Sequence, residues 1–151
     1  MDWLPQSSPG DHGYATFLND VDLLVMGRKT YDQILRLGPW PHGDRRCVVF
    51  SRGRARQREG QAEFVEGDVA SIVADLRAGP GGTIWLVGGA EIVAPCLVGR
   101  VVDEIIVTIL PILLGEGIPL FQPIARPAPL RLRRSQGYPD GLVQLTYDVV
   151  R

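Results

Sequence analysis

Two stretches of the sequence decide the fold: Leu24-Val25-Met26-Gly27-Arg28-Lys29-Thr30-Tyr31 and Trp85-Leu86-Val87-Gly88-Gly89-Ala90-Glu91-Ile92. Each begins with a continuous apolar run that ends at a glycine and continues into a segment with helical character. Continuous apolar runs of this length are typical of strands buried on both faces, as in parallel sheets. The two stretches therefore predict two strand-to-helix junctions in one parallel sheet.

The rest of the chain continues the alternation of strands and helices. Asp68 is expected to cap a helix whose apolar residues recur at helical spacing from residue 69 to residue 76. A hairpin is expected near the C-terminus, turning at residues 138–141. This order predicts an α/β sandwich whose mostly parallel sheet carries antiparallel strands at its end. The predicted strands are residues 23–26, 47–50, 62–65, 83–87, 101–110, 130–135 and 142–150, and the predicted helices are residues 8–18, 30–35, 69–78 and 90–97.

Composition narrows the class of protein. The chain has 151 residues, a net charge of −1 and no repeat or linker, which predicts a single domain spanning residues 1–151. A charge this close to zero gives no overall field that attracts nucleic acid or an anionic membrane, and the longest apolar run, residues 105–114, is too short to cross a membrane. Cys47 and Cys96 predict two buried, reduced thiols and no metal site. We therefore expect a cytoplasmic protein without a nucleic-acid or membrane partner.

The two glycine junctions are suited to binding phosphate groups. Parallel strands deliver their following loops to one edge of the sheet, where helix N-termini offer free N–H groups and a positive dipole end. At the first junction, Gly27 allows a close approach of the backbone, Arg28 and Lys29 add positive charge, and Thr30 can cap the helix. At the second, Gly88-Gly89 opens a helix directly, although the glycine pattern of the Rossmann fold is absent. The alternative is a pair of tight turns that need glycine for backbone reasons alone.

An arginine-rich loop follows the predicted strand at residues 47–50. Arginine and a hydroxyl group suit a phosphomonoester, such as the 2′-phosphate that distinguishes NADPH from NADH. Ser51 and Arg52 lie closest to the end of the strand and are the expected contacts. The alternative is a solvated basic loop.

Four segments occur in order along the chain: the two stretches quoted above, Val49-Phe50-Ser51-Arg52, and Val102-Asp103-Glu104-Ile105-Ile106-Val107-Thr108. Together they resemble the motifs of the dihydrofolate reductase superfamily, especially its bacterial branch related to the C-terminal reductase domain of riboflavin biosynthesis. The resemblance implies a dihydrofolate reductase-like three-layer sandwich with a mixed, mostly parallel central sheet. It also implies an oxidoreductase that transfers hydride from NADPH to a pterin-like or pyrimidine-like heterocycle.

The resemblance also implies which residues bind the cofactor. In the superfamily, the equivalents of the two glycine junctions hold the phosphates, and residues equivalent to Ser51 and Arg52 contact the 2′-phosphate. Relatives commonly form homodimers, and the apolar residues 109–114 are either such an interface or part of the core. The expected cofactor-binding residues are Gly27, Arg28, Lys29, Thr30, Ser51, Arg52, Val87, Gly88, Gly89, Ala90, Glu91 and Ile92.

The catalytic residues implied by the resemblance are Asp11 and Thr108. Asp11 lies where dihydrofolate reductases place the carboxylate that binds the substrate ring and assists its protonation, and Thr108 where they place a supporting threonine. The alternative for Asp11 is an acid that stabilises a helix N-terminus. His12 is expected to face solvent. Trp3 resembles a tryptophan in a loop beside the nicotinamide, or belongs to the core.

One departure from the superfamily affects the functional interpretation. Its members begin with a buried strand that precedes the position of Trp3, and the sequence opens at Met1-Asp2-Trp3. Three explanations are open: Met1 is a start assigned inside a longer gene, a swapped segment of a partner replaces the strand, or activity is impaired. Dihydrofolate reductase-like and 5-amino-6-(5-phosphoribosylamino)uracil reductase-like activities both remain candidates. The alternative function is a non-catalytic NADP(H)-binding or dimerising module.

Overall fold

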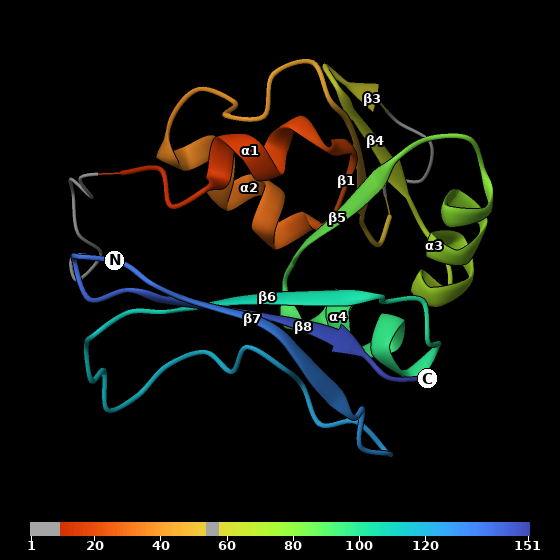
Figure 1. Ribbon diagram of the computed structural model, residues 1–151. Helices are drawn as coiled ribbons and strands as arrows, with labels where there is room; N and C mark the ends of the chain where they lie inside the picture. The colour runs from red at the N-terminus through yellow and green to blue at the C-terminus, as the bar shows by residue number, and fades with distance from the viewer. Residues whose placement is uncertain (1–9, 54–57) are drawn as a thin grey trace.

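The computed structural model describes residues 10–53 and 58–151 and contains two β-sheets with helices packed around them (Figure 1). One sheet has five strands in the order β3-β4-β2-β1-β5, and the other has three in the order β6-β8-β7. The strands are β1 (Val21–Gly27), β2 (Arg46–Phe50), β3 (Arg58–Glu59), β4 (Ala62–Val65), β5 (Thr83–Gly88), β6 (Glu104–Ile109), β7 (Leu130–Gly137) and β8 (Val143–Val149). The helices are α1 (Tyr14–Asn19), α2 (Arg28–Leu37), α3 (Val69–Ala78) and α4 (Ala90–Val98).

The larger sheet is parallel apart from one short strand. β4, β2, β1 and β5 are joined by parallel ladders, whereas β3 pairs antiparallel with the outer edge of β4. β1 lies between β2 and β5, which is why its residues 23–26 form a continuous apolar run. The expected mostly parallel sheet with antiparallel strands after it is confirmed, but the antiparallel strands form a sheet of their own.

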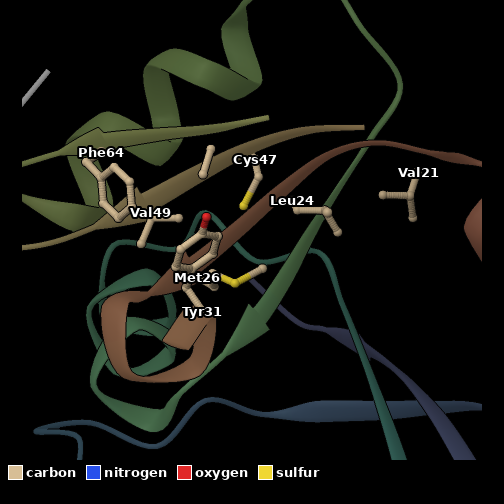
Figure 2. Packing of buried hydrophobic residues seen from close by; sticks show 8 residues of the cluster. Val21, Leu24, Met26, Tyr31, Cys47, Val49 and Phe64 are labelled. Atoms are coloured by element: carbon tan, nitrogen blue, oxygen red, sulfur yellow. The ribbon is translucent and has the colours of Figure 1, made fainter. Parts of the chain in front are cut away.

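Side-chain alternation along β1 divides the core into two layers. Leu24 and Met26 point to one face, where they pack with Tyr31 of α2 (Figure 2). Leu23 and Val25 point to the other face, where they pack with residues of α3 and α4. The sheet is therefore enclosed between α1 and α2 on one side and α3 and α4 on the other, as expected for a three-layer sandwich.

The two cysteines belong to different layers. Cys47 lies in the layer beneath α1 and α2, and Cys96 lies in the layer of α3 and α4. Both are free and have no solvent exposure, which confirms the prediction of buried thiols. Burial raises the pKa of Cys47 to about 12 and, together with the charge of Asp68, that of Cys96 to about 11.

The helix α3 begins and packs as its sequence predicts. The carboxylate of Asp68 accepts a hydrogen bond from the N–H of Ser71 at 2.8 Å, and hydrogen bonding by the side chain of Ser71, followed by this backbone bond, lowers the pKa of Asp68. α3 packs closely against Gly99, the residue that ends α4. A Cβ atom on Gly99 would lie 2.7 Å from the Cβ of Ala70, so the contact requires glycine.

Several predicted boundaries were wrong. Among the described residues, α1 begins at Tyr14, so residues 10–13 are not helical; Ser8 and Pro9 lie outside the described residues. α2 already begins at Arg28 and is capped by Gly27, so Thr30 lies inside the helix and cannot cap it. Residues 101–103 do not belong to β6. β3 was not predicted, because two residues carry no periodic pattern.

The three-stranded sheet is antiparallel throughout. β8 pairs with β6 on one side and with β7 on the other. The predicted hairpin is confirmed: the N–H of Gly141 donates to the carbonyl of Tyr138 at 2.9 Å, and Gly141 has a φ of +86°.

No helix in the described part of the chain is long and apolar enough to cross a membrane.

We predict that Gly99→Ala destabilises the protein by about 1–3 kcal/mol, because the new methyl group forces α3 and α4 apart. Urea denaturation measures the change. Gly117→Ala is the control, since a Cβ there meets nothing within 4 Å. Adding Ala70→Gly to Gly99→Ala should recover part of the loss by removing the clash; a strictly additive double variant would contradict this account.

Candidate cofactor-binding site

Three neighbouring strands end side by side at one edge of the larger sheet. In the parallel ladders, Gly27 at the end of β1 pairs with Phe50 at the end of β2, and Met26 pairs with Gly88 at the end of β5. Ser51 follows Phe50 directly. The structure therefore brings the two glycine junctions and the start of the arginine-rich loop to the same edge, as the sequence predicted.

The two glycine junctions are in direct contact. A Cβ atom on Gly27 would lie 3.2 Å from Cγ1 of Ile92, and one on Gly89 would lie 3.6 Å from Oγ1 of Thr30. A cis peptide bond joins Gly88 and Gly89. A Cβ on Gly88 would meet nothing within 4 Å, so the backbone there borders open space. A ligand can approach the backbone at this point without a side chain in its way.

Two helix N-termini meet at these junctions. Gly27 is the N-cap of α2 and Gly89 is the N-cap of α4, and neither helix end has a capping side chain. The first-turn N–H groups of an α-helix have no partner within the helix, and the helix dipole adds partial positive charge there. Two uncapped N-termini side by side form a surface suited to a group with more than one phosphate.

The side chains of Arg28 and Lys29, which follow Gly27, differ in how firmly they are held. The Nε of Arg28 donates to Asp32 at 2.7 Å, and the guanidinium lies 5.0 Å from the ring centre of Phe64. Arg28 is therefore fixed against its own helix and the core. Lys29 is 94% exposed, and its Nζ is 3.9 Å from a carboxylate oxygen of Glu91. An ion pair this exposed is weak, so Lys29 can turn toward an anion at the junction.

The start of the arginine-rich loop is anchored to the sheet. The N–H of Ser51 donates to the carbonyl of Val65 at 2.9 Å, so β2 and β4 hold the residue at the sheet edge. Ser51 is half-buried and Arg52 is exposed. Arg54 and Arg56 lie outside the described residues.

The two expected catalytic residues, Asp11 and Thr108, form hydrogen bonds with different partners. The carboxylate of Asp11 accepts hydrogen bonds from the N–H groups of Gly13 and Ala15, both at 3.0 Å, and these bonds lower its pKa. Asp11 thus stabilises the start of α1, which was the alternative interpretation. The Oγ1 of Thr108 on β6 accepts from Gln144 at 3.4 Å.

The prediction that His12 faces solvent was wrong. Its Nε2 lies 2.7 Å from a carboxylate oxygen of Asp140, and its ring packs edge-on against Tyr138 at 4.6 Å. The segment before α1 is thereby attached to the turn of the β7–β8 hairpin. Trp3 lies outside the described residues.

A groove of about 590 Å³ borders the junction at Gly88 and runs between β5 and β6. The sequence did not predict it, although the apolar runs of both strands are the signal that could have indicated it. Residues of α1, α3, α4 and the segment after β6 complete its lining, among them Phe17, Val73, Val93, Cys96, Leu120 and Phe121.

An aromatic cluster stands behind one side of this groove. Trp85 lies on β5 and packs edge-on against Phe17 at 5.1 Å and against the ring of His42 at 5.4 Å. His42 is buried, and its Nδ1 lies 3.2 Å from the hydroxyl of Tyr14. Its Nε2 has no hydrogen-bond partner among the described residues, and burial, aided by the charge of Arg45, lowers its pKa. Position 42, between a proline and a glycine, carries no pattern from which this burial could be predicted.

Comparison with known proteins identifies the family. Residues 20–144 match the model of the RibD C-terminal domain, and the chain belongs to this family. This confirms the resemblance to the dihydrofolate reductase-like superfamily and its riboflavin-biosynthesis branch.

The relatives include proteins without an assigned function. The chain is 34% identical to the uncharacterized protein YwjB of Bacillus subtilis, over 97% of this chain and 85% of that protein. It is 31% identical to the uncharacterized protein YyaP of the same organism, over 91% and 79% of the two chains.

Two solved structures share the fold. A putative riboflavin biosynthesis protein from Shewanella sp. PV-4 aligns with a TM-score of 0.87 and 31% identity, over all of this chain and 88% of that one. A pyrimidine reductase-like protein from Corynebacterium diphtheriae aligns with a TM-score of 0.72 and 18% identity, over 98% and 84% of the two chains. The second comparison supports the fold alone.

We predict that His42 makes the protein less stable in mild acid. Because its pKa is lowered in the folded state, protons bind the unfolded chain more readily, and the free energy of unfolding falls as the pH drops below about 6.5. Urea denaturation between about pH 7 and pH 5 measures the slope. His42→Phe should flatten this slope; an unchanged slope would show that other groups cause it.

Proposed function

We propose that the protein is an NADPH-dependent reductase that transfers hydride to a pyrimidine-like or pterin-like heterocycle. The observation that carries the proposal is the meeting of two uncapped helix N-termini with Ser51 at one edge of the sheet. Membership of the RibD C-terminal domain family and similarity to a putative riboflavin biosynthesis protein support a reductase of this type.

The described residues fit a phosphorylated dinucleotide. The N–H groups at the start of α2 and α4 would bind its pyrophosphate, with Lys29 adding charge. Ser51 and Arg52 would bind the 2′-phosphate. Bound NADPH supplies the hydride, so the protein's contribution is to position the two reactants and exclude water between them. The apolar groove beside Gly88 provides walls against which a planar ring can pack.

A second candidate is a module that binds NADP(H) without catalysis. The observation that favours it is the engagement of Asp11, whose carboxylate already accepts two backbone hydrogen bonds. A carboxylate with a lowered pKa is also a poor proton donor near neutral pH.

A homodimer is part of the proposal. Ile109, Ile112, Leu113 and Leu114 are each between 45% and 101% exposed, so these residues do not belong to the core of the single chain. Exposed apolar residues that lie together in this way are typical of protein interfaces. The segment 109–114 is therefore the expected contact between two copies.

The cofactor assignment predicts a preference for NADPH over NADH. Arg52→Ala should weaken NADPH binding about tenfold or more, because a charge-assisted bond to the 2′-phosphate contributes about 1.5–3 kcal/mol. NADH binding should change little. Calorimetric titration with both nucleotides measures this, with the exposed Arg36→Ala as control. Equal affinities for the two nucleotides in the unmodified protein would contradict the role given to Ser51 and Arg52.

The catalytic assignment predicts turnover that depends on Asp11. Dihydrofolate and 5-amino-6-(5-phosphoribosylamino)uracil are the two substrates to compare, with NADPH oxidation followed by its absorbance. Asp11→Asn should lower kcat by about 10²-fold or more if the carboxylate assists protonation. Unchanged turnover would remove Asp11 from the mechanism, and no turnover of either substrate would favour the non-catalytic module. Urea denaturation of the variant separates an effect on α1 from one on catalysis.

A further inference from the structure

A second cavity, of about 450 Å³, lies between the end of α4, residues 125–129 before β7, and the end of β8. We call it the α4–β8 pocket. Figure 1 shows the C-terminal end of β8 beside the end of α4. Among the described residues, the pocket shares no lining residue with the groove between β5 and β6. It is therefore a separate site, and its size suits a small organic molecule.

The walls of the α4–β8 pocket are aliphatic and firmly held. They include Val98 of α4, Pro127 and Pro129 before β7, and Val149 and Val150 at the end of β8. The N–H of Val150 donates to the carbonyl of Pro129 at 2.9 Å, which joins two of the walls. Because proline has a fixed φ, the segment before β7 loses little freedom when a ligand binds. Val98 and Val150 are 62% and 46% exposed, so this apolar surface is open to an occupant.

The charged residues of the pocket are all arginines. Arg100, Arg126 and Arg151 line it, and none of the described lining residues is acidic. Arg151 forms an ion pair with Asp103, which lies outside the pocket. The guanidinium groups of Arg100 and Arg126 have no hydrogen bond or ion pair within the described part of the chain. Two such cations beside an apolar cavity favour an occupant that carries a negative charge.

The backbone at Arg100 is unusual for an arginine. Arg100 follows Gly99, which ends α4, and its φ of +56° lies in the left-handed region. Helices commonly end with a glycine in this conformation, because a side chain there costs energy. A cation at the end of α4 interacts favourably with the helix dipole, which is the alternative explanation for Arg100. The dipole does not explain Arg126, which lies on another segment of the same pocket.

We propose that the α4–β8 pocket binds a small organic acid, a carboxylate attached to a short aliphatic chain. The guanidinium groups of Arg100 and Arg126 bind the carboxylate, since its two oxygens match the paired N–H groups of arginine. A carboxylate has a single charge and costs less to desolvate beside apolar walls than a doubly charged phosphate. An aliphatic chain suits the walls, because none of the described lining residues is aromatic. The proposal goes beyond the reductase function and does not depend on it.

Octanoate is the probe, and three related compounds separate its contributions. Hexanoate shortens the chain, octanol removes the charge, and octyl phosphate replaces the carboxylate. The full chain is titrated with each compound by calorimetry, and the NMR signals of the backbone amides locate the bound molecule. NADPH affinity is measured with and without octanoate, because the pocket and the groove share no lining residue.

The matched variants each remove one positive charge. Arg100→Gln and Arg126→Gln keep much of the side chain, and the double variant removes both charges. Arg36→Gln is the control, since Arg36 is exposed in the last turn of α2 and does not line the pocket. Urea denaturation shows that each variant is folded, and it measures the contribution of Arg100 to the end of α4 separately from ligand binding.

We expect one octanoate to bind per chain and to shift the amide signals of residues 97–101 and 125–130. Each single variant should weaken octanoate binding about threefold and the double variant about tenfold, because exposed charge pairs contribute little individually. Hexanoate should bind about tenfold more weakly than octanoate, because it lacks two methylene groups. Octanol should bind the double variant and the unmodified protein equally. Arg36→Gln should leave octanoate binding unchanged, and octanoate should leave NADPH affinity unchanged.

Four results would overturn the proposal. The first is a folded chain that does not bind octanoate. The second is equal octanoate binding by the double variant and the unmodified protein, because the arginines then have no part in it. The third is competition with NADPH, or amide shifts confined to β5 and β6, because octanoate then occupies the groove. The fourth is tighter binding of octyl phosphate than of octanoate, which would exclude a carboxylate as the preferred head group.

Discussion

The hydrogen-bond ladders that β1 forms with β2 and β5 are the constraint on which the rest of the structure depends. Because both ladders are parallel and in near register, Gly27, Ser51 and Gly88 reach the same edge of the sheet. The two core layers form on either side of these strands, and α2 and α4 start where β1 and β5 end. The candidate cofactor site is therefore a consequence of strand pairing, and few of its groups are side chains.

The sequence predicted those parts that are encoded locally. The apolar runs before Gly27 and Gly88 predicted buried strands, and Asp68 with the apolar spacing after it predicted α3. The placement of both glycine junctions at one edge also followed, since parallel strands deliver their following loops to the same edge of a sheet. Each of these features depends on residues near one another in the chain or on a general rule of sheet geometry.

Other features depend on contacts between distant segments and could not be predicted in this way. His42 is buried because Trp40, Trp85 and Tyr14 surround it, and His12 is held by Asp140 on the far hairpin. The order of the strands in the two sheets could not be predicted for a different reason. An apolar run has the same pattern whether the strand lies inside a sheet or at its edge, so the pattern does not show which neighbours are present.

The two cysteines allow the local opening of the protein to be measured by chemical labelling. Each thiol is sealed in a different layer, and only a thiolate that reaches solvent reacts with a disulfide reagent. Labelling of Cys47 therefore records fluctuations that lift α1 and α2 from the sheet, and labelling of Cys96 records those of α3 and α4. Equal labelling rates would mean that the sandwich opens as one cooperative unit. Unequal rates would mean that its two layers open independently of each other.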